Sequence, residues 1–225
     1  MEECYIRPIA FYGYGEMGLN PLKNKVDFAV AAWRWGAYLG KNALTHGVRC
    51  MVSSWRRINP LTLPPQAKCS ANYANASLAK IEAVKAGYDE AIMLNTQGMV
   101  SEGTGENIFR VKRGVLSTPN AAAGILRGIT RDTVIQLAAD LNISCHRIDI
   151  SREELYTADE LFLCGTAAEI APISEVDGRP IGDGDYPVTH KLQRAYEDTV
   201  RGRNKEHVDW LNWLSPRTRR QVLAV

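Results

Sequence analysis

The stretch Asn107-Ile-Phe-Arg-Val-Lys-Arg-Gly-Val-Leu-Ser-Thr118 predicts two short strands joined by a turn at Arg113-Gly114. A glycine at that turn tolerates the left-handed backbone of a tight hairpin, so the two strands are expected to pair antiparallel. Further on, residues 131–141 carry apolar side chains at helical spacing, and residues 143–150 return to a strand pattern. Hairpins mixed with strand–helix–strand connections favour an α+β fold with a mixed sheet over strict alternation of strands and helices.

The same spacing predicts elements on both sides of that stretch. Strands are predicted over residues 26–33, 48–54, 91–94 and 161–164, and helices over residues 76–86 and 188–200. In the first of these helices, Leu78, Ile81 and Val84 form an apolar stripe, and Gly87 follows as a stop signal. Asp177-Gly178 predicts a second hairpin turn.

The pattern also predicts two parts of unequal size. Residues 1–31 mix apolar runs with a glycine-rich segment, and Gly36-Ala-Tyr-Leu-Gly40 is typical of a connector. The expected limits are a remnant of a small N-terminal domain over 1–31, an interdomain loop over 32–44, a large domain over 45–214 and a tail over 215–225. Because the apolar stretch at residues 5–11 begins almost at the first residue, we expect the chain to lack the N-terminal part of its fold.

Composition argues against several classes of function. The chain has 27 Lys and Arg against 25 Asp and Glu, and this near balance disfavours nucleic acid or a membrane surface as a partner. No apolar run approaches the length of a membrane span or resembles a signal peptide. The five cysteines are odd in number and widely spaced, which predicts no disulfide framework, no metal site and a reducing, cytoplasmic compartment.

Several short segments contain residues able to carry chemistry. Lys68 has small or neutral neighbours and no acid nearby in the sequence, so it is either solvated or held in an apolar pocket as a reactive amine. Glu102 and Glu106 lie in a Gly/Thr-rich turn, where the backbone is able to approach a ligand closely. Thr130 is expected to cap the following helix, and Gly165-Thr166 to end a strand, so that both turns present amides to an anion.

Each of these signals has a plain structural alternative, namely a surface lysine, a solvated turn or an ordinary helix cap. Taken together, one lysine, one acid and two anion sites fit a phosphorylated cofactor that is held as a Schiff base. Pyridoxal 5'-phosphate is such a cofactor, because a lysine binds its aldehyde, a carboxylate keeps its ring nitrogen protonated and helix ends hold its phosphate.

Six motifs make this interpretation specific, because they occur in a fixed order along most of the chain. They are Tyr5-Ile-Arg-Pro8, Trp35-Gly-Ala-Tyr-Leu-Gly40, Ala67-Lys-Cys-Ser-Ala-Asn-Tyr73, Ser101-Glu-Gly-Thr-Gly-Glu-Asn107, Gly128-Ile-Thr-Arg-Asp132 and Gly165-Thr-Ala-Ala-Glu169. Residues 5 to about 213 resemble the branched-chain amino acid aminotransferases, which are class IV, fold-type IV pyridoxal-phosphate enzymes. The resemblance implies a fold-type IV large domain with a mixed or antiparallel sheet, a pseudo-barrel and helices, the remnant of an α/β small domain, and homo-oligomers of two or more copies.

The resemblance also implies a role for particular positions. Lys68 matches the catalytic lysine that forms the Schiff base, Glu102 the acid that pairs with the ring nitrogen, and Arg7 the arginine that serves the glutamate carboxylate. The matched cofactor-binding residues are Lys68, Tyr73, Glu102, Leu126, Ile129, Thr130 and Thr166. The matched substrate-binding residues are Tyr5, Arg7, Met17, Leu19, Trp35, Tyr38, Thr166 and Ala167.

The implied reaction is transamination of Leu, Ile and Val with 2-oxoglutarate, which gives branched-chain 2-oxo acids and L-glutamate. Two alternatives stay open: another class IV enzyme, such as a D-amino acid aminotransferase or an aminodeoxychorismate lyase, and an inactive fragment of the branched-chain enzyme. The chain departs from the family in two places. Residues that precede Tyr5 in the family, including an arginine for the cofactor phosphate, have no counterpart, and the sequence beyond Trp213 does not resemble the family end.

Overall fold

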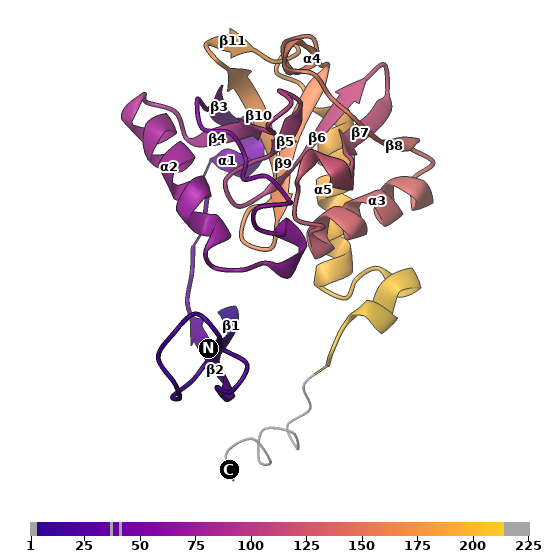
Figure 1. The fold of residues 1–225 in the computed structure, drawn as a ribbon. Helices are drawn as coiled ribbons and strands as arrows, with labels where there is room; N and C mark the ends of the chain where they lie inside the picture. The colour runs from indigo at the N-terminus through magenta and orange to yellow at the C-terminus, as the bar shows by residue number, and fades with distance from the viewer. Residues whose placement is uncertain (1–3, 37, 41, 214–225) are drawn as a thin grey trace. The chain divides into compact units, whose positions relative to one another are not determined.

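The computed structural model describes residues 4–36, 38–40 and 42–213 (Figure 1). By its internal contacts the chain divides into two compact units, Met1–Lys41 and Asn42–Val225. The four domain limits expected from the sequence remain a prediction, because this division identifies compact units and not the domains of a larger fold. The expected tail over 215–225 lies outside the described residues.

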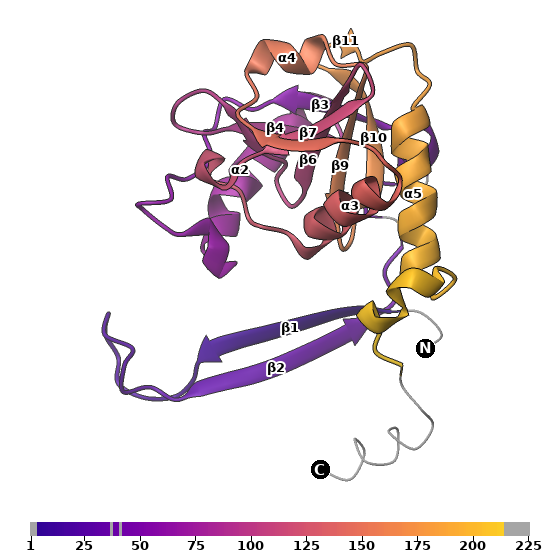
Figure 2. The same ribbon diagram turned by 90° about the vertical axis from the view of Figure 1, so that its right-hand side faces the viewer.

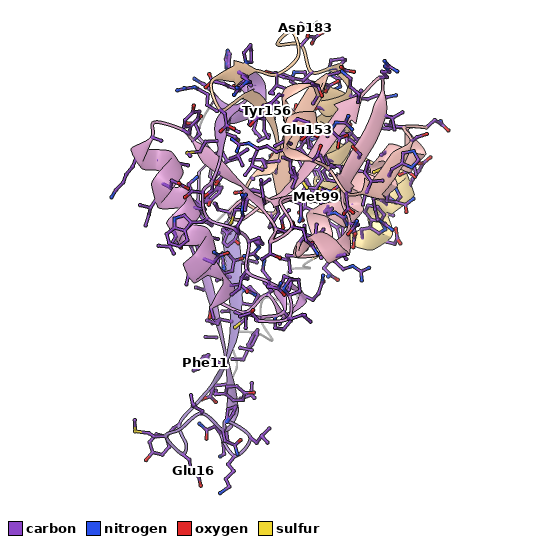
Figure 3. The ribbon with its side chains drawn as sticks, turned by 45° about the horizontal axis from the view of Figure 1, so that its top comes forward. Phe11, Glu16, Met99, Glu153, Tyr156 and Asp183 are labelled. Carbon is purple, nitrogen blue, oxygen red and sulfur yellow. The ribbon has the colours of Figure 1, made fainter. Side chains whose placement is uncertain are left out.

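The first unit is a β-hairpin. Strands β1 (Tyr5–Tyr12) and β2 (Val26–Trp33) pair antiparallel, from Tyr5 opposite Trp33 to Tyr12 opposite Val26, and Figure 2 shows them side by side. The strand predicted over residues 26–33 is confirmed. Apolar side chains project from this hairpin, as Phe11 does in Figure 3, and Phe11 is 45% exposed. A two-stranded ribbon of this kind is marginally stable in water by itself, so its apolar side chains call for a covering surface.

The second unit is built on a mixed sheet. Its strands are β3 (Val48–Val52), β4 (Glu90–Leu94), β5 (Val100–Glu102), β6 (Asn107–Lys112), β7 (Val115–Pro119), β8 (Cys145–Ile148), β9 (Glu160–Gly165), β10 (Glu169–Val176) and β11 (Arg179–Pro180). Their order is β5-β4-β3-β10-β9-β6-β7-β8, with β11 paired to β10. The pairs β3–β4, β3–β10 and β7–β8 are parallel and the other pairs are antiparallel, which confirms the predicted mixed sheet and α+β class.

Both predicted hairpin turns are confirmed. Arg113 and Gly114 have φ angles of 51° and 73°, and Asp177 and Gly178 have φ angles of 52° and 75°. Two successive positive φ angles are the geometry of the type I′ turn that joins strands with the natural right-handed twist. These turns set the antiparallel pairs β6–β7 and β10–β11.

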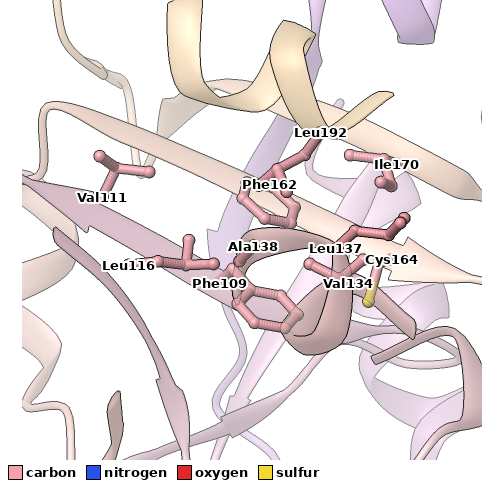
Figure 4. Close-up of a cluster of buried hydrophobic side chains, with 10 residues drawn as sticks. All are labelled: Phe109, Val111, Leu116, Val134, Leu137, Ala138, Phe162, Cys164, Ile170 and Leu192. Atoms are coloured by element: carbon pink, nitrogen blue, oxygen red, sulfur yellow. The ribbon is translucent and has the colours of Figure 1, made fainter. Parts of the chain in front are cut away.

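Helices pack on the sheet around two apolar clusters. The helices are α1 (Ala43–His46), α2 (Asn72–Lys85), α3 (Ile129–Asp140), α4 (Arg152–Tyr156) and α5 (Pro187–Val200). The larger cluster lies between the sheet and the neighbouring helices α3 and α5 (Figure 4), and in it the rings of Phe109 and Phe162 stack with centroids 4.9 Å apart. Among the described residues, no helix combines the length and the apolar character that a membrane span requires.

One predicted helix face is wrong. Leu78, Ile81 and Val84 of α2 are 43%, 52% and 58% exposed, whereas Ala76, Ala79 and Ala83 form the smaller cluster against β4. Alanine has the smallest apolar side chain, and so it lets the helix backbone lie close to the strand. The helix also starts at Asn72, four residues before the predicted start at residue 76.

Candidate active site

A cavity of about 310 Å³ lies in the second unit, between the first turns of α2 and α3, the turn that joins β5 to β6, and the end of β9. All seven residues matched to cofactor binding, Lys68, Tyr73, Glu102, Leu126, Ile129, Thr130 and Thr166, line this cavity. Ala167 follows Thr166 in the turn between β9 and β10. The remaining substrate-binding residues predicted from the sequence belong to the first unit, so the structure does not bring them together with the cavity.

Lys68 stands at a sharp bend in the wall of the cavity. It ends the 3-10 turn Pro65–Ala67 with a left-handed backbone, φ 47° and ψ 36°, and its amide donates to the carbonyl of Pro65 at 3.1 Å. Residues other than glycine adopt this conformation only where the surrounding structure imposes it, and they concentrate at functional sites. The backbone at Lys68 therefore supports the interpretation of this residue as part of an active site.

Glu102 is a buried carboxylate with a complete set of donors. It is 5% exposed at the end of β5 and accepts hydrogen bonds from Arg57 Nε at 2.8 Å, Asn107 Nδ2 at 3.1 Å and the Leu126 amide at 2.9 Å. Burial raises the pKa of Glu102 to about 7, although Arg57 and the Leu126 amide favour the charged form. The group is thus rigidly oriented, and any further cation in the cavity would lower its pKa again.

Arg57 and Asn107 are site residues that the sequence motifs did not identify by function. The side chain of Arg57 is 8% exposed, and its Nη1 atom has no hydrogen-bond partner among the described residues. Asn107 also donates to the carbonyl of Leu126 at 2.8 Å, which ties the loop before α3 to β6. Arg57 lies 45 residues before Glu102. No local signal identifies this pair, because only the folded sheet brings the two side chains together.

The start of α3 differs in detail from the sequence prediction. The N-cap is Gly128 and has no side-chain cap, whereas Thr130 lies within the first turn of the helix, so its predicted capping role is wrong. Gly128 is required there, because a Cβ atom at this position would lie 2.3 Å from Asn107 Oδ1. The free amides of the first turn still form the kind of site that binds anions.

Comparison with known proteins identifies the family of this arrangement. The family described as amino-transferase class IV matches residues 1–176. The branched-chain-amino-acid aminotransferase of Pseudomonas aeruginosa is 48% identical over 211 residues, which cover 93% of this chain and 68% of that protein. The enzyme of the same name from Escherichia coli K12 is 46% identical over 214 residues, which cover 94% of this chain and 69% of that protein.

Solved structures agree with these relatives. The crystal structure of the Escherichia coli branched-chain amino acid aminotransferase has a TM-score of 0.91 at 46% identity, over 94% of this chain and 70% of that one. The branched-chain amino acid aminotransferase of T.th. with pyridoxamine 5'-phosphate has a TM-score of 0.89 at 46% identity, with the same coverage. These structures confirm the predicted fold-type IV architecture. The chain therefore belongs to the class IV aminotransferases, within the group of the branched-chain amino acid enzymes.

Proposed function

We propose that this chain carries the catalytic centre for transamination of L-leucine, L-isoleucine and L-valine with 2-oxoglutarate, with pyridoxal 5'-phosphate held as a Schiff base on Lys68. The observation that carries the proposal is that Lys68 and Glu102 line the same cavity. The relatives named branched-chain-amino-acid aminotransferase support the choice of substrates. One of the similar structures contains pyridoxamine 5'-phosphate, which supports the choice of cofactor.

The residues of the cavity suit this cofactor. A volume of about 310 Å³ lies at the lower end of the range of small-molecule sites. Tyr73 would bind the ring hydroxyl, Leu126 would pack on the ring face, and the first turn of α3 together with Thr166 would hold the phosphate. When bound, pyridoxal phosphate supplies an electron sink for the carbanion that forms when the substrate Cα loses its proton.

Two side chains of the chain itself do the acid–base work in this proposal. Glu102 keeps a negative charge at the ring nitrogen, and its three hydrogen bonds fix the direction in which that charge acts. The amine of Lys68 becomes free when the substrate amine replaces it, and it then moves a proton between the reacting carbons. The protein thus needs one group that stabilises charge and one group that transfers the proton.

The hairpin of the first unit would supply the substrate side of the site. Arg7 donates to the hydroxyl of Tyr5 at 3.1 Å, and the Tyr5 ring lies edge-on to Trp35 with centroids 4.6 Å apart. Trp35 and Tyr38 make a similar contact at 5.6 Å. An arginine beside an aromatic cluster suits substrates that combine a carboxylate with an apolar or acidic side chain.

Met17 and Leu19 cannot belong to that cluster in the same chain. They lie in the loop between Tyr12 and Val26, at the opposite end of the hairpin from Tyr5. Seven residue steps of a strand span about 24 Å, which is too far for one small-molecule site. We therefore assign Met17 and Leu19 to the cavity of a second copy, in line with the expected homo-oligomer. Both side chains are fully exposed in the single chain.

The test is spectroscopic. Purified protein incubated with pyridoxal phosphate should develop the visible absorbance of a Schiff base, which Lys68→Ala abolishes. Lys85→Ala, an exposed lysine in the last turn of α2, serves as the control and should retain the absorbance. Unchanged absorbance in the Lys68→Ala variant would refute the assignment. Turnover of L-leucine rather than D-alanine then separates the proposed reaction from that of a D-amino acid aminotransferase.

The compartment and the completeness of the site are part of the same proposal. All five cysteines are free, which supports a reducing, cytoplasmic location. The chain spans 68% to 70% of the relatives and structures described above. The alternative of an inactive fragment therefore has its own test. It predicts that this chain lacks both the absorbance and leucine turnover, while a longer protein with additional N-terminal sequence shows both.

A further inference from the structure

Three buried glutamates lie together beside the cavity. Glu90, Glu102 and Glu106 are 0%, 5% and 4% exposed, on β4, at the end of β5 and just before β6. Glu90 pairs with Lys80 at 2.7 Å, and Glu102 pairs with Arg57 at 2.8 Å. Within the described residues, no cation lies within ion-pair distance of Glu106.

The three carboxyl groups also differ in their hydrogen bonds. Glu90 accepts from Lys80, from Thr104 Oγ1 at 2.7 Å and from the Ala91 amide at 2.7 Å, and Glu102 likewise has three donors. Glu106 accepts only from the Gly105 amide, at 3.1 Å on Oε2. Its other oxygen, Oε1, is buried with no hydrogen-bond partner among the described residues. A carboxylate buried without a cation or a full set of donors is expensive, and binding a proton removes that cost.

Glu106 is nevertheless part of the cavity wall and is closely packed there. It lines the cavity together with Thr104, Gly105 and Gly165. A Cβ atom at Gly103 would lie 2.7 Å from Glu106 Oε2, and one at Gly165 would lie 3.8 Å from its Cα and Cγ atoms. The two glycines therefore leave room for this carboxyl group beneath the turn that also carries Glu102.

We propose that Glu106 is a neutral carboxylic acid in the wall of the cavity and acts as a positioning residue, because the proton it holds leaves the negative charge on Glu102. This inference rests on the proposed function only for the role of Glu102 in the reaction. The neutral state of Glu106 follows from the packing and the charges alone.

The surrounding charges agree with this distribution of the proton. Burial raises the pKa of Glu106 to about 8, and the charge of Glu90 acts in the same direction. Glu102 also raises the pKa of Glu106, whereas Lys80 lowers it. The pKa of Glu102 reaches only about 7, so Glu106 holds its proton to higher pH. The other titratable groups that face Glu106 are Cys50 and Cys164, and burial raises the pKa of both thiols, so they add no charge.

A pair of matched substitutions tests the neutral state. Glu106→Gln reproduces a protonated carboxyl group, whereas Glu90→Gln removes a carboxylate and leaves Lys80 without its charge partner. We expect Glu90→Gln to lower the melting temperature at pH 7 by several degrees, and Glu106→Gln to lower it by clearly less. If Glu106→Gln is as damaging as Glu90→Gln at this pH, Glu106 is ionised and the proposal is wrong.

The pH dependence of stability gives a second readout that needs no cofactor. A pKa raised from 4.5 in the unfolded chain to about 8 in the fold means that the native state holds an extra proton between these values. Stability from this group is complete at low pH and is lost as pH rises through that window. The melting temperature of the wild type should therefore fall relative to that of Glu106→Gln between pH 5 and 8. Parallel curves would overturn the proposal.

The effect on the reaction is measured separately, as the pH profile of kcat/KM for L-leucine. The ratio of kcat/KM in Glu106→Gln to that in the wild type should rise roughly fivefold between pH 8 and 9, because ionisation of Glu106 affects only the wild type. A constant ratio, with the stability curves as expected, would refute the positioning role. Absence of turnover in every variant would refute the proposed function, while the stability curves still decide whether Glu106 is neutral.

Discussion

The cavity of the second unit and the hairpin of the first unit hold their predicted site residues in opposite ways. In the cavity, residues that are far apart in the sequence converge, and Glu102 is fixed by donors from Arg57, Asn107 and Leu126. On the hairpin, residues close in the sequence diverge to opposite ends of two strands. Buried, hydrogen-bonded groups thus form a rigid site within one unit, whereas exposed groups on a ribbon depend on other surfaces to complete theirs.

The largest effect should come from the charge at the centre of the cavity. Glu102→Gln keeps the shape of the side chain but removes the negative charge at the ring nitrogen, so we expect kcat for L-leucine to fall by about a hundredfold or more. Glu153→Gln, an exposed glutamate on α4 that is labelled in Figure 3, should leave kcat unchanged. Steady-state kinetics decides the matter, and equal kcat values in the two variants would remove Glu102 from the reaction.

A second variant tests whether long-range contacts make the cavity rigid. Arg57→Met leaves Glu102 buried without its cation, which should cost about 3 kcal/mol of unfolding free energy at pH 7. The pKa of Glu102 should also rise further, because Arg57 favours its charged form. Arg56→Met, at the exposed neighbouring position, is the control in urea denaturation. If both variants lose the same small amount, the ion pair does not stabilise the cavity.

The comparison also explains how far the sequence could predict this molecule. The turns at Arg113-Gly114 and Asp177-Gly178 were predictable because a local signal, glycine at a positive φ, determines them. Strand β6 has the bounds that its residues predict for the same reason. The Arg57–Glu102 pair was not predictable, since it joins segments 45 residues apart whose proximity depends on the whole sheet.

The errors have a physical cause as well. The apolar residues of α2 were assigned to the core by size, but the sheet selected the alanine face because it allows closer packing. Thr130 was expected at the N-cap because threonine favours that position, but the contact between Gly128 and Asn107 sets the start of α3 one residue before Thr130. In both places tertiary contacts outweighed a local preference of less than about 1 kcal/mol.

A smaller effect should follow from the close contact at the start of α3. In Gly128→Ala the new Cβ atom would lie 2.3 Å from Asn107 Oδ1, so the loop must shift, and we expect a loss of about 1–3 kcal/mol. Gly36→Ala in the first unit meets no atom within 4 Å and should be close to neutral. Denaturation curves of the two variants compare a buried and an open position directly. A neutral Gly128→Ala would mean that the loop is not held against Asn107.

The smallest signal tests the assignment of the hairpin loop to a second copy. Lys68→Ala has a damaged cavity but an intact loop, and the double variant Met17→Asp/Leu19→Asp has the reverse. If each loop serves a partner's cavity, mixed dimers contain one complete site. Random pairing of equal amounts should then recover about a quarter of wild-type activity. Mixing Lys68→Ala with Glu102→Gln is the matched control, because both defects lie in the cavity and no pairing restores it. Recovery no greater than in this control, with subunit exchange verified by differently tagged chains, would assign Met17 and Leu19 to no shared site. The hairpin would then be an apolar surface without a direct part in the reaction.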